Sequence, residues 1–285
     1  MSEVFDAEWL AQREPFDAMA RNAGLAARLV AALPPRPVIT DLGAGAGSLF
    51  RWLAPRIAGD QAWLLVDADA GLLGHGLDVT ARWAGARGYT VRSGSGLTVR
   101  TPLGVWRVAA RVADLADLAP LDITSADAVV CSALLDLVSP RWIADLAAKS
   151  SGPVAAFLNV DGRDLILPNH ASDPSVVTGF RRDQSRDKGF GPSVGRHAEA
   201  AFRAGFTAHG FTVTSAASQW RIPPGAARML TALVHGHATA AARWMPTARG
   251  AIAAWQKMRL RQIAVGRLAM RVGHRDLLAL PQGEH

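Results

Sequence analysis

Three glycines, each two residues after the last, stand between a predicted strand and a predicted helix near the start of the chain. The segment reads Asp41-Leu-Gly-Ala-Gly-Ala-Gly-Ser48 and follows the apolar residues Val38 and Ile39. Glycine lets the backbone turn sharply and lets a ligand come close to the main chain. The helix expected after the loop would begin with unpaired N–H groups. The loop therefore predicts a strand–turn–helix unit with a ligand site at its turn.

Short apolar strands alternate with helices along most of the chain. We expect strands at 38–42, 62–66, 105–112, 128–131, 154–160, 211–220 and 268–280, with a hairpin within 89–112. We expect helices at 14–33, 49–57, 70–86, 141–149 and 197–209, and a helical region over 223–265. Strands that are apolar throughout indicate a parallel sheet covered on both faces. The predicted fold class is α/β.

The 285 residues, 49% of them hydrophobic, are enough for one sizeable domain. We expect a single domain over 1–285, made of a helical cap (1–36), a ligand-binding core (37–160), a polar variable segment (161–195) and a helical insertion (223–265). The only cysteine, Cys131, excludes an intramolecular disulfide and a cysteine-built metal site. The sequence has no apolar run of about 18 residues and no basic leader at its start, so we expect a cytoplasmic protein without a membrane partner.

The positive charge of the chain is concentrated near its carboxyl end. The formal net charge is +7, and residues 221–275 contain ten basic and no acidic residues. Such a segment can attract an anion, such as a phosphorylated metabolite, a carboxylate or a nucleic acid. It can equally be the solvated surface of arginine-rich helices. The sequence leaves both interpretations open.

The spacing of the glycines separates two kinds of nucleotide loop. The dinucleotide fingerprint is G-x-G-x-x-G, whereas the third glycine here comes one position early and Ser48 follows it. No G-K-[ST] follows, which excludes a P-loop. An acid, Asp41, stands two residues before the first glycine. This arrangement resembles motif I of class I S-adenosylmethionine (SAM)-dependent methyltransferases.

Further segments narrow the resemblance. The segments REPFDAMAR (13–21), DLGAGAGSLFRWLAP (41–55), SALLDLVS (132–139) and GHRDLLALP (273–281) resemble a bacterial group of these methyltransferases whose acceptor is unassigned. The resemblance implies a Rossmann-like, doubly wound, seven-stranded sheet, mostly parallel with an antiparallel last strand, plus helical insertions. It implies SAM as cofactor and S-adenosylhomocysteine as product. Asp183 stands where members of this group have a histidine.

The expected SAM-binding residues follow successive strands, where ligands bind in open α/β sheets. A carboxylate at Asp67 can accept hydrogen bonds from both ribose hydroxyls of an adenosine ligand. Arg13, Asp17 and Arg21 share one face of the first helix, and we expect Arg13 or Arg21 to meet the carboxylate of the methionine part. The expected SAM-binding residues are Arg13, Arg21, Asp41, Gly43, Ala44, Gly45, Gly47, Ser48, Asp67, Ala68, Asp114, Leu115, Ser132 and Ala133.

A general base would help if the acceptor is a hydroxyl or a protonated amine. The candidates are Asp136, Asp161, His170, Asp183 and His197, of which Asp136, His170 and Asp183 are the predicted catalytic residues. Asp136 is preferred because it directly follows the fourth core strand. Cys131 is interpreted as an inert core residue. No metal site is predicted.

Four functions remain as alternatives. The preferred one is methylation of a small molecule. An RNA or protein methyltransferase using residues 221–275 is the second, although no RNA-binding module argues for nucleic acid. A SAM-binding protein that does not methylate is the third, and a NAD-dependent enzyme is the fourth. We further expect residues 223–265 to cover the cleft, with Ile252, Trp255, Leu260 and Ile263 buried and with Lys257 and Arg261 favouring an anionic acceptor.

Overall fold

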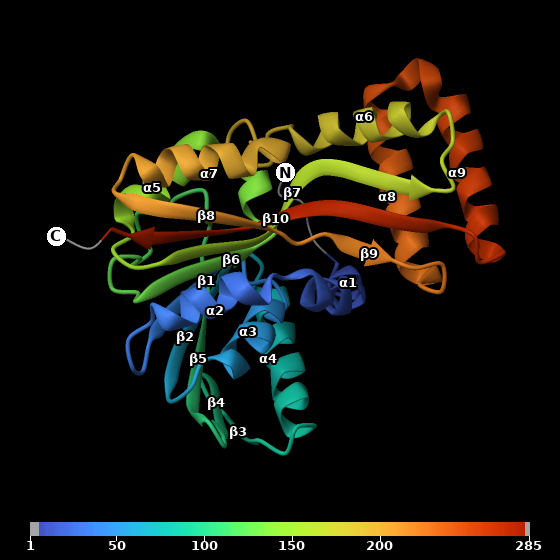
Figure 1. The fold of residues 1–285 in the computed structure, drawn as a ribbon. Coiled ribbons are helices and arrows are strands. Elements are labelled where there is room, and N and C mark those ends of the chain that lie inside the picture. Colours follow the sequence, from blue (N-terminus) through green and yellow to red (C-terminus); the bar gives the residue numbers. More distant parts are fainter. Residues whose placement is uncertain (1–5, 283–285) are drawn as a thin grey trace.

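A ten-stranded mixed sheet runs through residues 6–282, the part of the chain that the computed structural model describes (Figure 1). Its central strands are parallel, and β10 is antiparallel to both of its neighbours, β7 and β8. The prediction of a doubly wound, mostly parallel sheet with an antiparallel last strand is confirmed. In spatial order seven strands are β5 (Gly104–Val112), β2 (Gln61–Asp67), β1 (Val38–Leu42), β6 (Ala128–Ser132), β7 (Val154–Leu167), β10 (Ala269–Pro281) and β8 (Phe211–Ala217).

Three further strands extend this set of seven. The hairpin of β3 (Thr90–Ser93) and β4 (Gly96–Thr101) continues the sheet beyond β5, as the turn residues predict. Strand β9 (Trp220–Ile222) pairs with the first residues of β10. The single strand expected at 211–220 is therefore two strands, because the chain leaves the edge of β10 after β8 and joins it again at β9.

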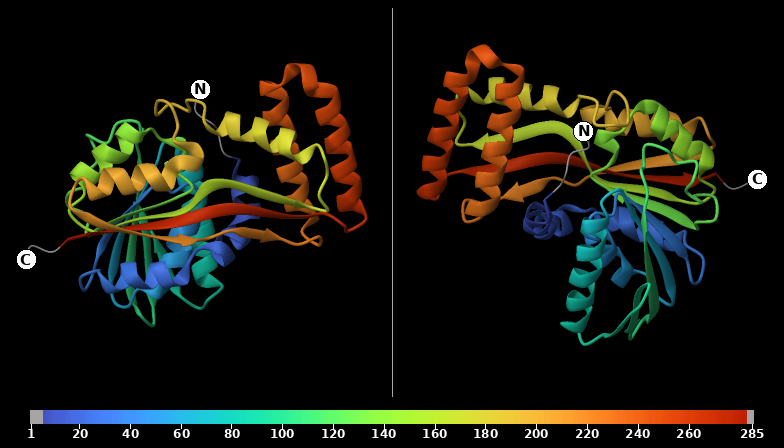
Figure 2. Two further views of the ribbon diagram at one scale, coloured as in Figure 1. Left: turned by 45° about the horizontal axis from the view of Figure 1, so that its top comes forward. Right: turned by 180° about the vertical axis from the view of Figure 1, so that it is seen from behind.

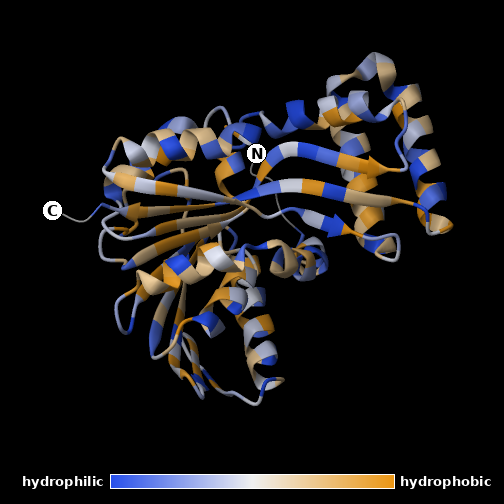
Figure 3. Cartoon of the chain, in the orientation of Figure 1, coloured by the Kyte–Doolittle hydropathy of each residue, from blue (hydrophilic) through white to orange (hydrophobic). Residues whose placement is uncertain are grey.

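Helices cover both faces of the central sheet (Figures 1 and 2). On one face lie α2 (Ala23–Ala31), α3 (Ser48–Leu53) and α4 (Ala70–Gly85), whose apolar side chains share a buried cluster with the strands. On the other face lie α5 (Pro140–Lys149) and α7 (Ala198–Thr207) with a second cluster. Coloured by hydropathy, the strands between these layers are largely hydrophobic (Figure 3). The described chain also contains four short 3₁₀ helices: η1 (Ala54–Arg56), η2 (Leu135–Leu137), η3 (Gly195–His197) and η4 (Pro246–Ala248).

The expected first helix, 14–33, is two helices. Helix α1 spans Ala7–Ala20 and is capped by Asp6, whose side chain accepts a hydrogen bond from the Glu8 backbone N–H. The predicted start at Glu14 is seven residues too late. Proline favours the first turn of a helix, whereas Pro15 lies inside α1. The chain turns at Arg21, and Asn22 caps α2 by accepting a hydrogen bond from the Leu25 N–H.

Strand β7 continues well past Val160, where the sequence prediction ended it. Its last residues, through Leu167, pair with β10, and a bulge at residues 161–163 faces Gly273. The residues of this extension are mostly polar, so their sequence does not have the apolar pattern of a buried strand. They form a strand because their backbone pairs with β10, a distant part of the chain. Part of the segment expected to be variable, 161–195, is thus strand, and another part is α6 (Asp173–Gln184).

A third apolar cluster lies at the far end of the β7–β10 extension. It joins β9 and α6 to the antiparallel pair α8 (Ala227–Trp244) and α9 (Arg249–Ala264). Ile252, Trp255 and Ile263 are buried there and Leu260 is half-buried, as the helical spacing predicts. Lys257 and Arg261 are exposed. None of the described helices is both long and apolar enough to cross a membrane.

Candidate SAM-binding site

The glycine loop between β1 and α3 has the backbone that its sequence requires. Gly43, Gly45 and Gly47 have φ values of 68°, 50° and 77°, in the left-handed region that favours glycine. The N–H groups of Gly43 and Ala44 donate to the Val66 carbonyl of β2, at 2.9 and 3.0 Å. The Gly45 N–H donates to the Asp67 carboxylate at 2.8 Å. Strand β2 therefore holds the loop in its turn.

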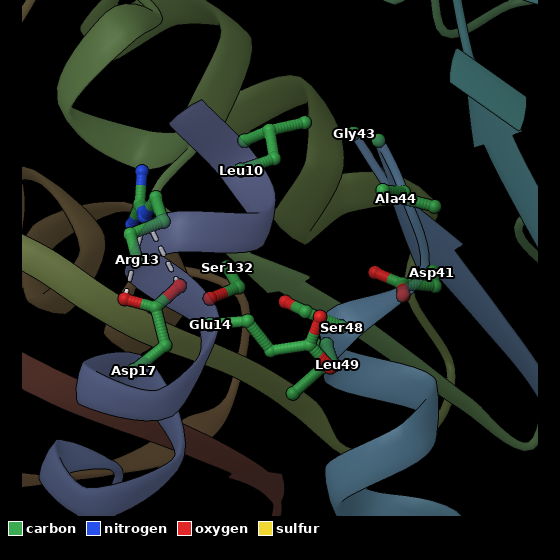
Figure 4. Close-up of a pocket in the computed structure, with 12 residues that line it drawn as sticks. Leu10, Arg13, Glu14, Asp17, Asp41, Gly43, Ala44, Ser48, Leu49 and Ser132 are labelled. Atoms are coloured by element: carbon green, nitrogen blue, oxygen red, sulfur yellow. Dashed lines mark hydrogen bonds and ion pairs between the residues drawn. The ribbon is translucent and has the colours of Figure 1, made fainter. Parts of the chain in front are cut away.

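A cavity with an empty volume of about 450 Å³, part of it open to solvent, lies between this loop and α1 (Figure 4). Below we call it the loop cavity. Its lining residues are Leu10, Arg13, Glu14, Asp17, Asp41, Gly43, Ala44, Gly45, Ala46, Ser48, Leu49 and Ser132.

Asp41 puts an unsatisfied carboxyl group into the wall of the loop cavity. The residue is 1% exposed, and neither side-chain oxygen has a hydrogen-bond partner among the described residues. Burial raises the pKa of this carboxyl to about 8, although the Arg21 charge acts in the opposite direction. A buried acid without a partner is costly, so the site favours a cationic or hydrogen-bond-donating ligand at this point.

Arg21 connects the glycine loop with the end of β6. Its Nη2 donates to the hydroxyl oxygens of Ser48 and Ser132, at 3.0 and 3.1 Å. Its Nε is buried and has no partner within residues 6–282. Burial lowers the pKa of this guanidinium, and Asp17, 4.0 Å away, counteracts the effect. Arg21 can thus offer a buried positive charge and a free donor next to the loop cavity.

Helix α1 forms one wall of the loop cavity, and two of its acidic side chains bond residues of other elements. The Arg13 Nε bonds both oxygens of Asp17, at 3.0 and 3.3 Å, and Asp17 also accepts the indole N–H of Trp220 at 3.0 Å. Glu14 pairs with Arg51, whose Nη2 lies 2.6 Å from the carboxylate. Strand β9 and helix α3 therefore hold the helix from two sides.

The remaining predicted SAM residues lie around the loop cavity without lining it. The Asp67 carboxylate accepts hydrogen bonds from the backbone N–H groups of Gly45, in the loop, and of Asp69. Leu115 is buried, and its side chain lies close to Gly43. Asp114 is exposed and accepts the Ala116 N–H. Gly47, Ala68 and Ala133 are placed at the ends of the loop, of β2 and of β6.

The structure separates the three predicted catalytic residues. Asp136 lies in η2, four residues after Ser132, and is 7% exposed. His170 is exposed in the turn before α6, where its backbone N–H donates to Asp173, and it does not line the loop cavity. Asp183 lies on α6 and accepts the indole N–H of Trp244. Of the three, Asp136 alone lies on the segment that leaves the loop cavity at Ser132.

The two remaining base candidates also do not line the loop cavity. Asp161 is engaged by Arg163, and His197 accepts a hydrogen bond from the Arg196 Nε at 3.2 Å. Cys131 is buried, and this burial raises the pKa of its thiol, as expected for an inert core residue. Within the described range, no three His, Cys, Asp or Glu side chains are grouped so that they could hold a metal ion.

Sequence reasoning missed several residues of the site. Leu10 and Glu14 line the loop cavity from the same face of α1 as Arg13 and Asp17. A helix predicted to begin at Glu14 leaves Leu10 outside it, although the i, i+3/i+4 spacing of these four residues matches one helix face. Ala46 and Leu49 were within the quoted motif and were not singled out. Trp220 does not line the loop cavity but bonds Asp17, and the sequence does not reveal this contact because it depends on β9 meeting α1.

Comparisons with known proteins support the fold. No protein-family profile matches the chain, and no curated protein is similar to it in sequence. A structure from Anaeromyxobacter dehalogenans, described as a candidate type II methyltransferase, is 17% identical and superposes with a TM-score of 0.50 over 93% of this chain and 99% of the other. A candidate sarcosine dimethylglycine methyltransferase from Galdieria sulphuraria is 14% identical, with a TM-score of 0.44 over 90% and 84%. The cyclopropane synthase MmaA2 from Mycobacterium tuberculosis is 12% identical, with a TM-score of 0.44 over 90% and 83%.

The match to the Anaeromyxobacter dehalogenans structure and the strand order agree on the fold. The chain has the fold of the class I SAM-dependent methyltransferases, and the resemblance seen in the glycine loop is confirmed at this level.

Proposed function

We propose that this protein binds SAM in the loop cavity and transfers its methyl group to a small-molecule acceptor. The observation that carries the proposal is the pair of unsatisfied buried groups there, the carboxyl of Asp41 and the Nε of Arg21. The methionine part of SAM has an ammonium and a carboxylate, which complement an acid and a guanidinium. Beside these two groups, the glycine loop lets the ligand come close to the main chain.

The residues present fit this cofactor. Arg13 and Asp17 line the cavity with charges of both signs, Asp41 adds its buried carboxyl, and Ser48 and Ser132 add hydroxyl groups. Asp67 would serve the ribose only if it shared its carboxylate with the Gly45 N–H, which it already accepts. When bound, SAM supplies a methyl group that its positively charged sulfur makes electrophilic. The protein has to bind it, exclude water and hold the acceptor in line.

Asp136 is the residue that we propose as general base. It is nearly buried in η2, on the segment that begins at Ser132 in the wall of the loop cavity. A base of this kind contributes about 10²–10⁴-fold to a rate. Asp136→Asn should lower the rate of S-adenosylhomocysteine formation with an acceptor found by screening, and should leave the affinity for S-adenosylhomocysteine within twofold. An unchanged rate would exclude this role.

Two alternatives have less support. A NAD-dependent enzyme would need the dinucleotide spacing of glycines, which the loop lacks. An RNA or protein methyltransferase would use the basic residues of 221–275. In the described chain none of these residues lines the loop cavity.

Calorimetry with SAM, S-adenosylhomocysteine and NAD tests the proposal. We expect the wild type to bind the first two and not NAD. Asp41→Asn should weaken binding about ten- to a hundredfold, because a hydrogen bond to a charged group contributes about 1.5–3 kcal/mol. Asp117→Asn is the matched control, since Asp117 is exposed and only accepts the Ala119 N–H. Absence of SAM binding to the wild type would overturn the proposed function.

A further inference from the structure

A second and larger cavity lies between the end of α6, the turn η3 and the end of α8. Its empty volume is about 1,050 Å³, and it shares no lining residue with the loop cavity. We call it the arginine cavity. Its lining residues are Thr178, Arg181, Arg182, Gln184, Ser185, Arg186, Arg196, His197 and Trp244. Four of the nine are arginines, and none is an acid.

Most of this positive charge is not neutralised by the protein. Arg181, Arg182 and Arg196 form no ion pair with any carboxylate of residues 6–282. Arg186 differs, because its Nε lies 3.5 Å from Asp183. Like charges held together around one cavity repel each other, so an anion placed between them would lower the electrostatic energy.

Two of these arginines lie close to the sheet. Gly162, in the bulge of β7, has a φ of 75°, and a Cβ added there would meet the Arg196 Cβ at 3.1 Å and the Arg181 Nε at 3.6 Å. The Arg181 Nε is buried and has no hydrogen-bond partner in the described structure. A buried donor left unsatisfied costs about 1–3 kcal/mol. A ligand oxygen that reached it would remove this cost.

The donors around the arginine cavity match phosphate oxygens. Guanidinium groups bind phosphate through two parallel N–H···O bonds, which makes arginine the preferred residue for planar recognition of phosphate. The side-chain amide of Gln184 adds a neutral donor. Trp244 is 43% exposed and offers a ring surface at the rim. Three unpaired guanidinium groups suit a ligand with two or three negative charges, such as a diphosphate or a phosphate ester.

The wall of the arginine cavity is attached to the segment that follows β6. The hydroxyl of Ser193 donates to the Arg186 carbonyl at 2.7 Å and to the Leu137 carbonyl of η2 at 2.8 Å. Turn η2 also contains Asp136, and its preceding strand ends at Ser132 in the loop cavity. The two cavities are therefore separate, but both are connected to the segment 132–137: the loop cavity at Ser132, and the arginine cavity through the hydrogen bond of Ser193 to Leu137.

We propose that the arginine cavity is a binding site for a phosphate-bearing small molecule, in addition to the SAM site. The proposal does not depend on SAM binding, because no residue is common to the two cavities. A nucleic acid is the less favoured occupant, since the charge lies inside a cavity lined by a few residues and not along an extended surface.

Calorimetric titration with pyrophosphate, at low and at physiological salt, tests this site in the full-length protein. We expect saturable binding to the wild type and at least a tenfold loss of affinity in the double variant Arg181→Gln/Arg196→Gln. Arg182→Gln alone, at an exposed position, should lose about three- to tenfold. Arg249→Gln is the matched control, an exposed arginine on α9 outside the cavity, and should change affinity less than twofold.

Three outcomes would overturn the proposal. The first is no pyrophosphate binding to the wild type. The second is an equal loss in Arg182→Gln and Arg249→Gln, which would show unspecific attraction. The third is tight binding of a single-stranded RNA oligonucleotide where pyrophosphate fails. S-adenosylhomocysteine affinity, measured on the same variants, should stay within twofold. A failure of the SAM proposal would therefore appear in the S-adenosylhomocysteine titrations and not in the pyrophosphate titrations.

Discussion

The two cavities of this molecule treat charge in opposite ways. In the loop cavity acids and arginines are mixed: Arg13 is paired with Asp17, Arg51 with Glu14, and one buried acid and one buried guanidinium donor remain unsatisfied. In the arginine cavity three guanidinium groups have no acidic partner among the described residues. The first arrangement complements a ligand with both charges, and the second complements an anion.

The difference also concerns how each cavity is built. The loop cavity depends on backbone geometry, because its floor is a glycine loop held by β2 and approached closely by α4. The arginine cavity depends on long side chains around a single glycine, Gly162. Small changes of backbone should therefore damage the first cavity most, whereas loss of individual charges should damage the second.

The largest effect is expected from a methyl group at Gly76. This α4 residue packs on the glycine loop, and a Cβ there would lie 2.8 Å from the carbonyl carbon of Ala46. Gly76→Ala should force the loop and helix apart, which costs about 1–3 kcal/mol of unfolding free energy. We expect at least a tenfold loss of S-adenosylhomocysteine affinity and no change in pyrophosphate affinity.

Gly74→Ala is the control for this prediction, because a Cβ at Gly74 meets no atom within 4 Å. It should stabilise α4 by up to about 1 kcal/mol, as alanine is the better helix former. Denaturant titration and calorimetry measure both quantities. If both variants behaved alike, the tight contact with Ala46 would not control the loop cavity.

The second prediction concerns Arg21, which bonds Ser48 and Ser132 in the first cavity. Arg21→Lys keeps a positive charge but loses the two-pronged geometry. We expect about a tenfold loss of affinity for S-adenosylhomocysteine and less than a twofold loss for methylthioadenosine, which lacks the amino-acid part. An equal loss for the two ligands would mean that Arg21 shapes the cavity and does not contact the methionine part.

The third prediction is a pH effect confined to the loop cavity. Burial raises the pKa of Asp41 from 3.8 to about 8, so between these values the folded protein holds a proton that the unfolded chain has lost. Stability falls with rising pH where the folded state binds more protons, by up to about 1.4 kcal/mol per pH unit for one group. Relative to Asp41→Asn, the wild type should lose unfolding free energy from pH 5 to pH 8 and then level off.

Denaturant titrations of both proteins at each pH measure this difference. The carboxyl group contributes most stability at the acid end, near and below its unfolded pKa, and this contribution is lost as the pH approaches about 8. Saturating S-adenosylhomocysteine should reduce the loss, because its ammonium would favour the ionised carboxyl. A pH-independent difference would show that Asp41 does not carry the buried proton.

The sequence predicted the loop cavity far better than the arginine cavity, for a physical reason. Gly43, Gly45 and Gly47 reveal their backbone geometry locally, because positive φ values favour glycine. Arg181 and Arg196, by contrast, come together only because β7 continues past Val160 and carries Gly162 beneath them. That extension depends on pairing with residues 269–272, about a hundred positions away, and no local pattern reports it.

Position in the fold also bears on the charges that the sequence singles out. Lys257 and Arg261 are predicted to attract an anion, because they belong to the most basic segment of the chain. The structure places both on exposed parts of α9, and neither lines either cavity. The buried cation of that helix is Arg259, 0% exposed, which pairs with Asp173 and donates to the Pro168 carbonyl.

The smallest effect is therefore expected from Lys257→Gln/Arg261→Gln. Charges on an exposed helix face are screened over about 8 Å at physiological salt, so their removal should change pyrophosphate and S-adenosylhomocysteine affinity less than twofold. The arginine-cavity variant Arg181→Gln/Arg196→Gln removes the same formal charge and should lose at least tenfold. Since both double variants lower the net charge from +7 by two, the comparison separates position from total charge. Equal losses of pyrophosphate affinity would mean that the overall field of the protein, and not a built site, attracts the anion.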